Sequence, residues 1–209
     1  CLAEQAKILY AEAEENNLDN KAIIARFGRW YSCSLCEQDY HGVVSCALGW
    51  ACWKTYLGRP ETDMSRRSAM SALGNGLSDA GHHADALPVK EAELAMERRL
   101  GASEESLLDV QSNLASTYAK LGRHEEALRM QKDVYSGRLK LDGEEHEDTL
   151  IAAHNYANSL CDLKRFKEAR SLLRKTIPVA RRVLRDNDRL TLVMRVVYAA
   201  AIYDDPGAT

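Results

Sequence analysis

The sequence predicts an all-α fold, a right-handed α-solenoid of stacked antiparallel helix pairs. The chain of 209 residues has only 12 glycines and 4 prolines and lacks alternating β-branched runs, which disfavours strands. Apolar residues instead recur at i, i+3, i+4 and i+7 spacings, as on one face of a helix. The whole pattern returns after 41 or 42 residues, which is typical of a repeat protein.

Composition and charge exclude several classes of protein. Apolar residues make up 45% of the chain, and 28 Lys and Arg against 31 Asp and Glu leave a net charge of −3. This balance excludes a disordered tail and a strongly basic nucleic-acid-binding module. The longest apolar stretch, Val43–Trp53, is far shorter than the roughly 18–20 residues that span a bilayer. We therefore expect protein or peptide partners, with no nucleic acid and no membrane span.

The repeats are visible when the chain is compared with itself. Segment 113–141 meets 155–183 after a shift of 42 residues and meets 72–100 after a shift back of 41. A weaker copy covers 40–58. Small residues recur where two helices would cross closely, at Gly74, Ala115, Ala157 and Ala199 and again at Ala86, Ala127 and Ala169.

Each unit is predicted to be a helix pair. In the unit that begins near Leu107, the turn falls at 121–123. The apolar faces of its two helices are expected to carry Leu114, Ala115 and Tyr118, then Ala127, Leu128, Val134 and Leu141. Helix N-caps are expected at Ser103 or Ser106 and at Asp148 or Thr149.

Pro88 and Pro178 fall inside predicted second helices. Each proline removes a backbone donor, so a local kink or break is expected there.

The pattern divides the chain in two. Residues 1–60 would hold degenerate N-terminal helices or a first repeat, with clustered cysteines and tryptophans. Residues 61–209 would hold repeats at about 64–105, 107–148 and 149–190, and the first helix of a further repeat at 191–209. Since one helix pair cannot bury its apolar face alone, this fractional count predicts a slice of a longer array.

These residues resemble tetratricopeptide (TPR) repeats. The pattern A-x-x-Y-x-x-x-G-x-x-E-E-A-L is legible at Ala115–Leu128. The long period and the link LDGEEHEDTL (Leu141–Leu150) are similar to the kinesin light chain type of repeat. The resemblance implies a TPR superhelix and a non-catalytic scaffold that binds a peptide or partner segment in its concave groove.

The same resemblance implies which residues face the groove. First helices line it, and the asparagine that bonds a peptide backbone corresponds to Asn113 and Asn155. The preceding unit departs from the pattern, with Ala72 there and Asn75 one turn on. The expected peptide-groove set is Asn75, Ser112, Asn113, Ser116, Lys120, His154, Asn155 and Asn158. The alternative is an ordinary solvated polar face. The cationic clamp of chaperone-tail binders is not matched, since Ser71 and Ser112 stand where it needs cations.

The cysteines carry a second interpretation. Cys33-x-x-Cys36 has zinc-knuckle spacing, but Cys46 and Cys52 are separated by five residues, which is wrong for a usual knuckle. Packing as small apolar residues is the favoured interpretation, with zinc or a disulfide as alternatives. The isolated Cys1 and Cys161 argue for a reducing, cytoplasmic compartment.

No other feature indicates catalysis or a cofactor. Histidines at 82, 83, 124 and 146 have no acid or thiol at catalytic spacing, and no phosphate-binding loop or H-E-x-x-H motif occurs. Two interpretations are open for Trp30, Trp50 and Trp53: they pack between helices, or they form a surface for a partner. The basic stretch 165–195 is interpreted as a solvated face or as a site for an acidic partner. A binding scaffold leads. The alternatives are a structural segment of a larger assembly and a zinc-containing N-terminal module.

Overall fold

The computed structural model describes residues 2–205, which fall into two compact units that divide between Gly101 and Ala102. Within the described residues all regular elements are helices, and the only β-pairing is an isolated bridge between Ser32 and Asp39. The all-α prediction is confirmed. No described helix is long and apolar enough to cross a membrane.

The first unit is built on an aromatic core. Its elements are α1 (Leu2–Glu15), α2 (Asn20–Phe27), the 3-10 helix η1 (Gly28–Trp30), α3 (Gly42–Tyr56), α4 (Met64–Asp79) and α5 (His83–Arg99). The rings of Tyr10, Phe27 and Tyr56 lie within 5.3–5.8 Å of one another between α1, α2 and α3. Trp30 and Cys52 complete this core.

Two glycines let α3 and α4 approach closely. A Cβ atom added at Gly76 would lie 2.6 Å from the carbonyl oxygen of Ser45, and one added at Gly49 would lie 2.6 Å from that of Ala72. Each glycine therefore faces the backbone of the other helix. A side chain at either position would force the two helix axes apart.

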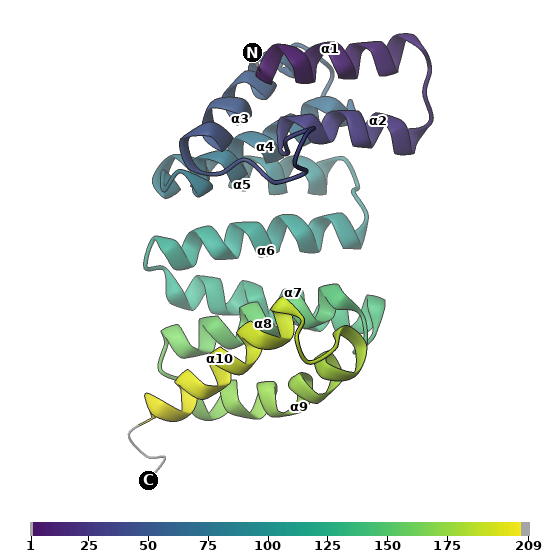
Figure 1. Cartoon of the computed structure of the whole chain (residues 1–209). Helices are drawn as coiled ribbons and strands as arrows, with labels where there is room; N and C mark the ends of the chain where they lie inside the picture. Colours follow the sequence, from purple (N-terminus) through teal and green to yellow (C-terminus); the bar gives the residue numbers. More distant parts are fainter. Residues whose placement is uncertain (1, 206–209) are drawn as a thin grey trace. The chain divides into compact units, whose positions relative to one another are not determined.

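The second unit consists of antiparallel helix pairs that follow one another along the chain (Figure 1). Its helices are α6 (Glu104–Lys120), α7 (His124–Asp142), α8 (Glu147–Asp162), α9 (Phe166–Leu184) and α10 (Arg189–Tyr203). Each helix packs against the next, and α10 also contacts α8. Leu150, Leu173 and Met194, from α8, α9 and α10, share one buried cluster.

The predicted small residues lie at helix crossings, with one exception. Ala115, Ala127, Ala157 and Ala169 are at most 1% exposed. Ala199 is exposed, because no helix among residues 2–205 follows α10 to cover that face. Leu141 is also 45% exposed, because it lies in the last turn of α7 beyond the packed face.

The helix starts differ slightly from the prediction. Helices α6, α8 and α10 begin at 104, 147 and 189, two or three residues before the predicted 107, 149 and 191. Residues 206–209 of the last predicted helix lie outside the described residues. The predicted division at residue 60 also differs from the compact units, because the close α3–α4 packing spans it.

The capping residues confirm one expectation and correct the other. Ser103 caps α6 by accepting a hydrogen bond from the backbone N–H of Ser106, as one of the two predictions had it. Helix α8 is capped by His146, whose ring nitrogen accepts from the N–H of Asp148 at 3.3 Å. Thr149 is buried inside the first turn of α8 and so cannot cap it.

The turn at 121–123 joins α6 to α7 as predicted. Gly122 has φ 76°, and Gly81 has φ 83° at the equivalent place, in the region that only glycine enters freely. Lys164 occupies the third equivalent turn with φ 58°. The turn geometry therefore persists where the favourable residue is lost.

Neither proline breaks its helix. Pro88 lies inside α5 and Pro178 inside α9, and both helices continue on each side. A proline removes one backbone hydrogen bond, and the buried neighbours Ala86 and Ala180 hold the helices against their partners.

Candidate functional site: a polar pocket between α6 and α8

A pocket of about 290 Å³ opens in the second unit between two first helices. Helix α6 forms one wall, α8 the other, and α7 contributes a single residue between them. Its lining residues are Ala115, Ser116, Ala119, Lys120, Gln131, Asn155, Asn158, Ser159 and Asp162. The two alanines keep the wall of α6 low, so a backbone could approach it closely.

Four residues of the predicted groove set line this pocket: Ser116, Lys120, Asn155 and Asn158. The helical spacing explains the pairs, because residues three or four apart share one face. Of the two predicted asparagines, only Asn155 contributes. Asn113 is exposed on α6 and does not line the pocket, and Asn75 is exposed in the first unit.

Ser112 links the two walls and the floor. Its carbonyl oxygen accepts a hydrogen bond from the Ser116 hydroxyl at 3.1 Å and another from the Gln131 amide Nε2 at 3.3 Å. Its hydroxyl lies 3.5 Å from the Asn155 Nδ2 atom, which donates to it. Ser112 thereby orients Gln131 of α7 through its carbonyl oxygen and Asn155 of α8 through its hydroxyl.

His154 orients the second asparagine of α8. The Nδ2 atom of Asn158 lies 3.0 Å from Nε2 of His154. When Nδ2 of Asn158 donates, the ring nitrogen accepts, which requires the neutral imidazole. Burial lowers the pKa of His154, which favours the same neutral form.

Gln131 is the residue that sequence reasoning missed. It belongs to a second helix and is only 2% exposed. Its Oε1 atom is buried and has no hydrogen-bond partner. The repeats do single out this position. Lys90, Gln131 and Leu173 are equivalent in three successive repeats, so a cation, an amide and an apolar side chain occupy the same place in turn.

Opposite charges flank the pocket. Lys120 at the end of α6 and Asp162 at the end of α8 are both exposed. The Asp162 carboxylate lies 3.6 Å from Nδ1 of His124, so the structure supplies the acidic neighbour that spacing along the sequence did not indicate.

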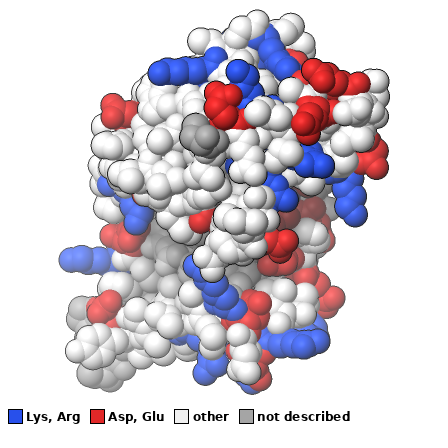
Figure 2. All heavy atoms as spheres, turned by 45° about the horizontal axis from the view of Figure 1, so that its top comes forward, with Lys and Arg blue, Asp and Glu red and all other residues white. Residues whose placement is uncertain are grey.

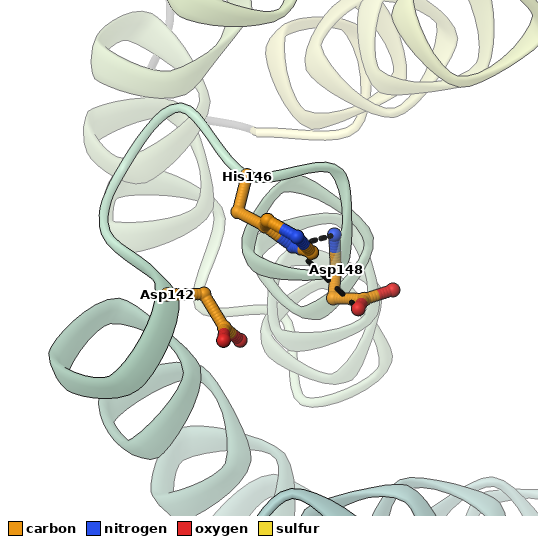
Figure 3. A group of neighbouring side chains, drawn as sticks. All are labelled: Asp142, His146 and Asp148. Atoms are coloured by element: carbon orange, nitrogen blue, oxygen red, sulfur yellow. Dashed lines mark hydrogen bonds and ion pairs between the residues drawn. The ribbon is translucent and has the colours of Figure 1, made fainter.

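A second group of ligating side chains lies at the other end of α7. Asp142, His146 and Asp148 come within reach of a common metal ion, from the end of α7 and the start of α8 (Figure 3). Arg138, only 3% exposed, places Nη1 3.3 Å from Asp142 and 3.8 Å from Asp148, and it also pairs with Asp109. The guanidinium already supplies the cation, so we assign this group to the packing of α6, α7 and α8.

The four cysteines of the zinc alternative are not brought together. Cys52 is fully buried in the aromatic core, while Cys46 packs against the cluster of Leu73 and Leu77. Among residues 2–205, no group of three potential metal ligands includes a cysteine. Cys33 lies in an irregular segment, where backbone N–H groups of Cys36 and Leu35 lower its pKa.

The structure shows where the tryptophans and the charges of the basic stretch 165–195 lie. Trp30 is buried in the core, whereas Trp50 is 44% exposed. Several cations of the basic stretch are paired, in the ion pairs Arg170–Asp205, Arg181–Asp186 and Arg182–Glu145. On the face seen in Figure 2, acidic and basic side chains are interspersed.

Comparison with known proteins agrees with the fold. A family model for the tetratricopeptide repeat matches residues 106–182. A kinesin light chain candidate of Podosopora anserina with nearly identical TPR-like repeats has a TM-score of 0.62 at 20% identity, covering 97% of this chain and 85% of that one. A single-substitution variant of the same protein has a TM-score of 0.63 with the same identity and coverage.

BtubC (BKLC) from P. vanneervenii has a TM-score of 0.59 at 15% identity, covering 78% of this chain and 63% of that one. No curated protein matches the chain. The structural likenesses establish the fold, and the family model places the repeats on the second unit, where the pocket lies. Residues 106–182 are therefore similar to tetratricopeptide repeats, and the solved structures share the fold over most of the chain.

Proposed function

We propose that this chain is a non-catalytic scaffold that binds an extended peptide segment of a partner protein across α6 and α8. Tetratricopeptide repeats generally serve as protein–protein interaction scaffolds. The observation that carries the proposal is the pocket between the two first helices, with amide side chains from α7 and α8 in its lining.

The chemistry of the lining suits a peptide. An amide side chain both donates and accepts hydrogen bonds, so Asn155 and Asn158 can pair with a peptide group of any sequence. Their orientation is held by Ser112 and His154, which reduces the conformational entropy lost on binding. The walls of Ala115 and Ala119 leave room for a main chain beside them.

A library of random-sequence peptides on beads, incubated with the labelled full chain, tests the proposal. Binding above background is expected, with Asn155→Ala and Asn158→Ala each weakening the selected peptides by about two- to tenfold. Asn187→Ala removes an exposed asparagine outside the pocket and is the matched control. No binding above background, or equal loss in the control, would refute the proposal.

A further inference from the structure

The unpaired acceptor beneath the pocket between α6 and α8 sets a chemical requirement on the ligand. Gln131 is 2% exposed and lines this pocket. Its Nε2 atom donates to the carbonyl oxygen of Ser112 at 3.3 Å. Since a carbonyl only accepts, this bond settles which end of the amide is which. The Oε1 atom has no partner among the residues described.

A buried acceptor that lacks a hydrogen-bond donor costs free energy. A ligand that donates to Oε1 therefore gains more binding free energy than a ligand that only fills the pocket. A carboxylate would bring further acceptors against Oε1. An apolar group would leave Oε1 buried without a hydrogen bond. Both are therefore disfavoured at the floor of the pocket.

The rest of the lining narrows the ligand group further. Lys120 and Asp162 line the same pocket, and they offer donors and acceptors respectively, so together they favour a neutral ligand group that both accepts and donates hydrogen bonds. A primary carboxamide carries an N–H donor and a carbonyl acceptor on one carbon. It can thus satisfy both Gln131 and Lys120.

We infer that this pocket selects a peptide side chain that ends in a primary carboxamide, asparagine or glutamine, whose N–H group donates to Oε1 of Gln131. This inference rests on the proposed peptide-binding function. It makes Gln131 a specificity-determining residue.

The chain's own repeats supply the test variants. The position of Gln131 is held by Leu173 in the following repeat and by Lys90 in the preceding one, and both of those residues are buried in helices of the same kind. Gln131→Leu removes the acceptor, and Gln131→Lys replaces it with donors. Gln111→Leu makes the first change at a position of α6 that does not line the pocket. Circular dichroism first establishes that each variant is folded.

The probe is the random peptide library on beads, followed by three synthetic versions of the best binder with Asn, Leu or Asp at its most selective position. The wild type and Gln111→Leu should prefer Asn over Leu and over Asp by roughly tenfold. Gln131→Leu should lose this preference, and Gln131→Lys should shift it towards Asp.

Each outcome bears on a different claim. Binding without enrichment of Asn or Gln, or a preference unchanged in both Gln131 variants, overturns the inference while the scaffold proposal stands. Absence of binding to any peptide overturns both. Loss of preference in Gln111→Leu as well would also overturn the assignment to Gln131.

Discussion

Replacing Gly76 by alanine tests the close approach of α3 and α4. In an exposed helix interior this change gains about 1 kcal/mol, because alanine is the better helix former. Here the added Cβ would lie 2.6 Å from the Ser45 carbonyl oxygen and 3.0 Å from the Cα of Cys46, both backbone atoms. Neither can rotate away, so the helices must separate by several tenths of an ångström.

The separation has a calculable cost. Overpacking a well-packed contact typically costs about 1–3 kcal/mol, and a gap of roughly 0.5–1 Å forfeits a quarter to a half of each dispersion contact along the interface. The reciprocal contact at Gly49 loosens at the same time. The dispersion lost along the interface roughly cancels the gain of about 1 kcal/mol in helix propensity, so the overpacking remains as a net loss of about 1–3 kcal/mol in the free energy of unfolding. For a chain of this size that lowers Tm by about 2–10 °C.

Thermal unfolding followed by far-UV circular dichroism measures the effect. Gly28→Ala is the matched control, since a Cβ there meets nothing within 4 Å and its φ of −54° suits any residue. That variant should be neutral or more stable by up to about 1 kcal/mol. A Tm for Gly76→Ala at or above that of the wild type would refute the close backbone approach.

Two further predictions concern buried charges. Burial lowers the pKa of Lys90 to about 8, below its unfolded value, so between about pH 8 and 10 the unfolded chain binds more protons and stability rises with pH. Over that pH range the free energy of unfolding of the wild type, measured with urea, should rise by about 2 kcal/mol more than that of Lys90→Gln. If the unfolding free energies of the two proteins changed in parallel with pH, this prediction would be wrong. Arg138→Met should cost about 1–3 kcal/mol, less than a fully buried pair, because its partners Asp109 and Asp148 are 64% and 44% exposed and can hydrate. Arg165→Ala, which breaks only an exposed pair with Glu168, should leave Tm unchanged in the same assay, and equal losses would show that burial of Arg138 does not matter.

The repeat architecture was predictable because its signals are local. Helix periodicity and the glycine turns depend on residues within a few positions of one another, and the repetition after 42 residues supplied the same answer several times. The turn 121–123 and the buried alanines at 115 and 127 follow directly from this. Even Lys164 adopts the turn that glycine adopts in its neighbours, because the packing of two helices holds it there.

The candidate site was only half predictable. Repeat positions indicated that Ser116, Lys120, Asn155 and Asn158 share the faces of first helices, and the structure places them in one pocket. The same reasoning placed Asn113 beside Asn155. A helical face is wider than a pocket, however, and the rotation of α6 against α8 leaves Asn113 outside it.

The helix pairs, their 42-residue period and the positions of their turns can be predicted from residues close together along the chain. Three features depend on how the helices pack: Gly49 and Gly76 bring α3 and α4 together, Arg138 neutralises acids from three helices, and Gln131 reaches the floor of a pocket built by other helices. The reason is physical. Helix formation and capping involve neighbours along the chain, whereas pockets and ion pairs depend on the distance and rotation between helix axes, which many side chains determine together.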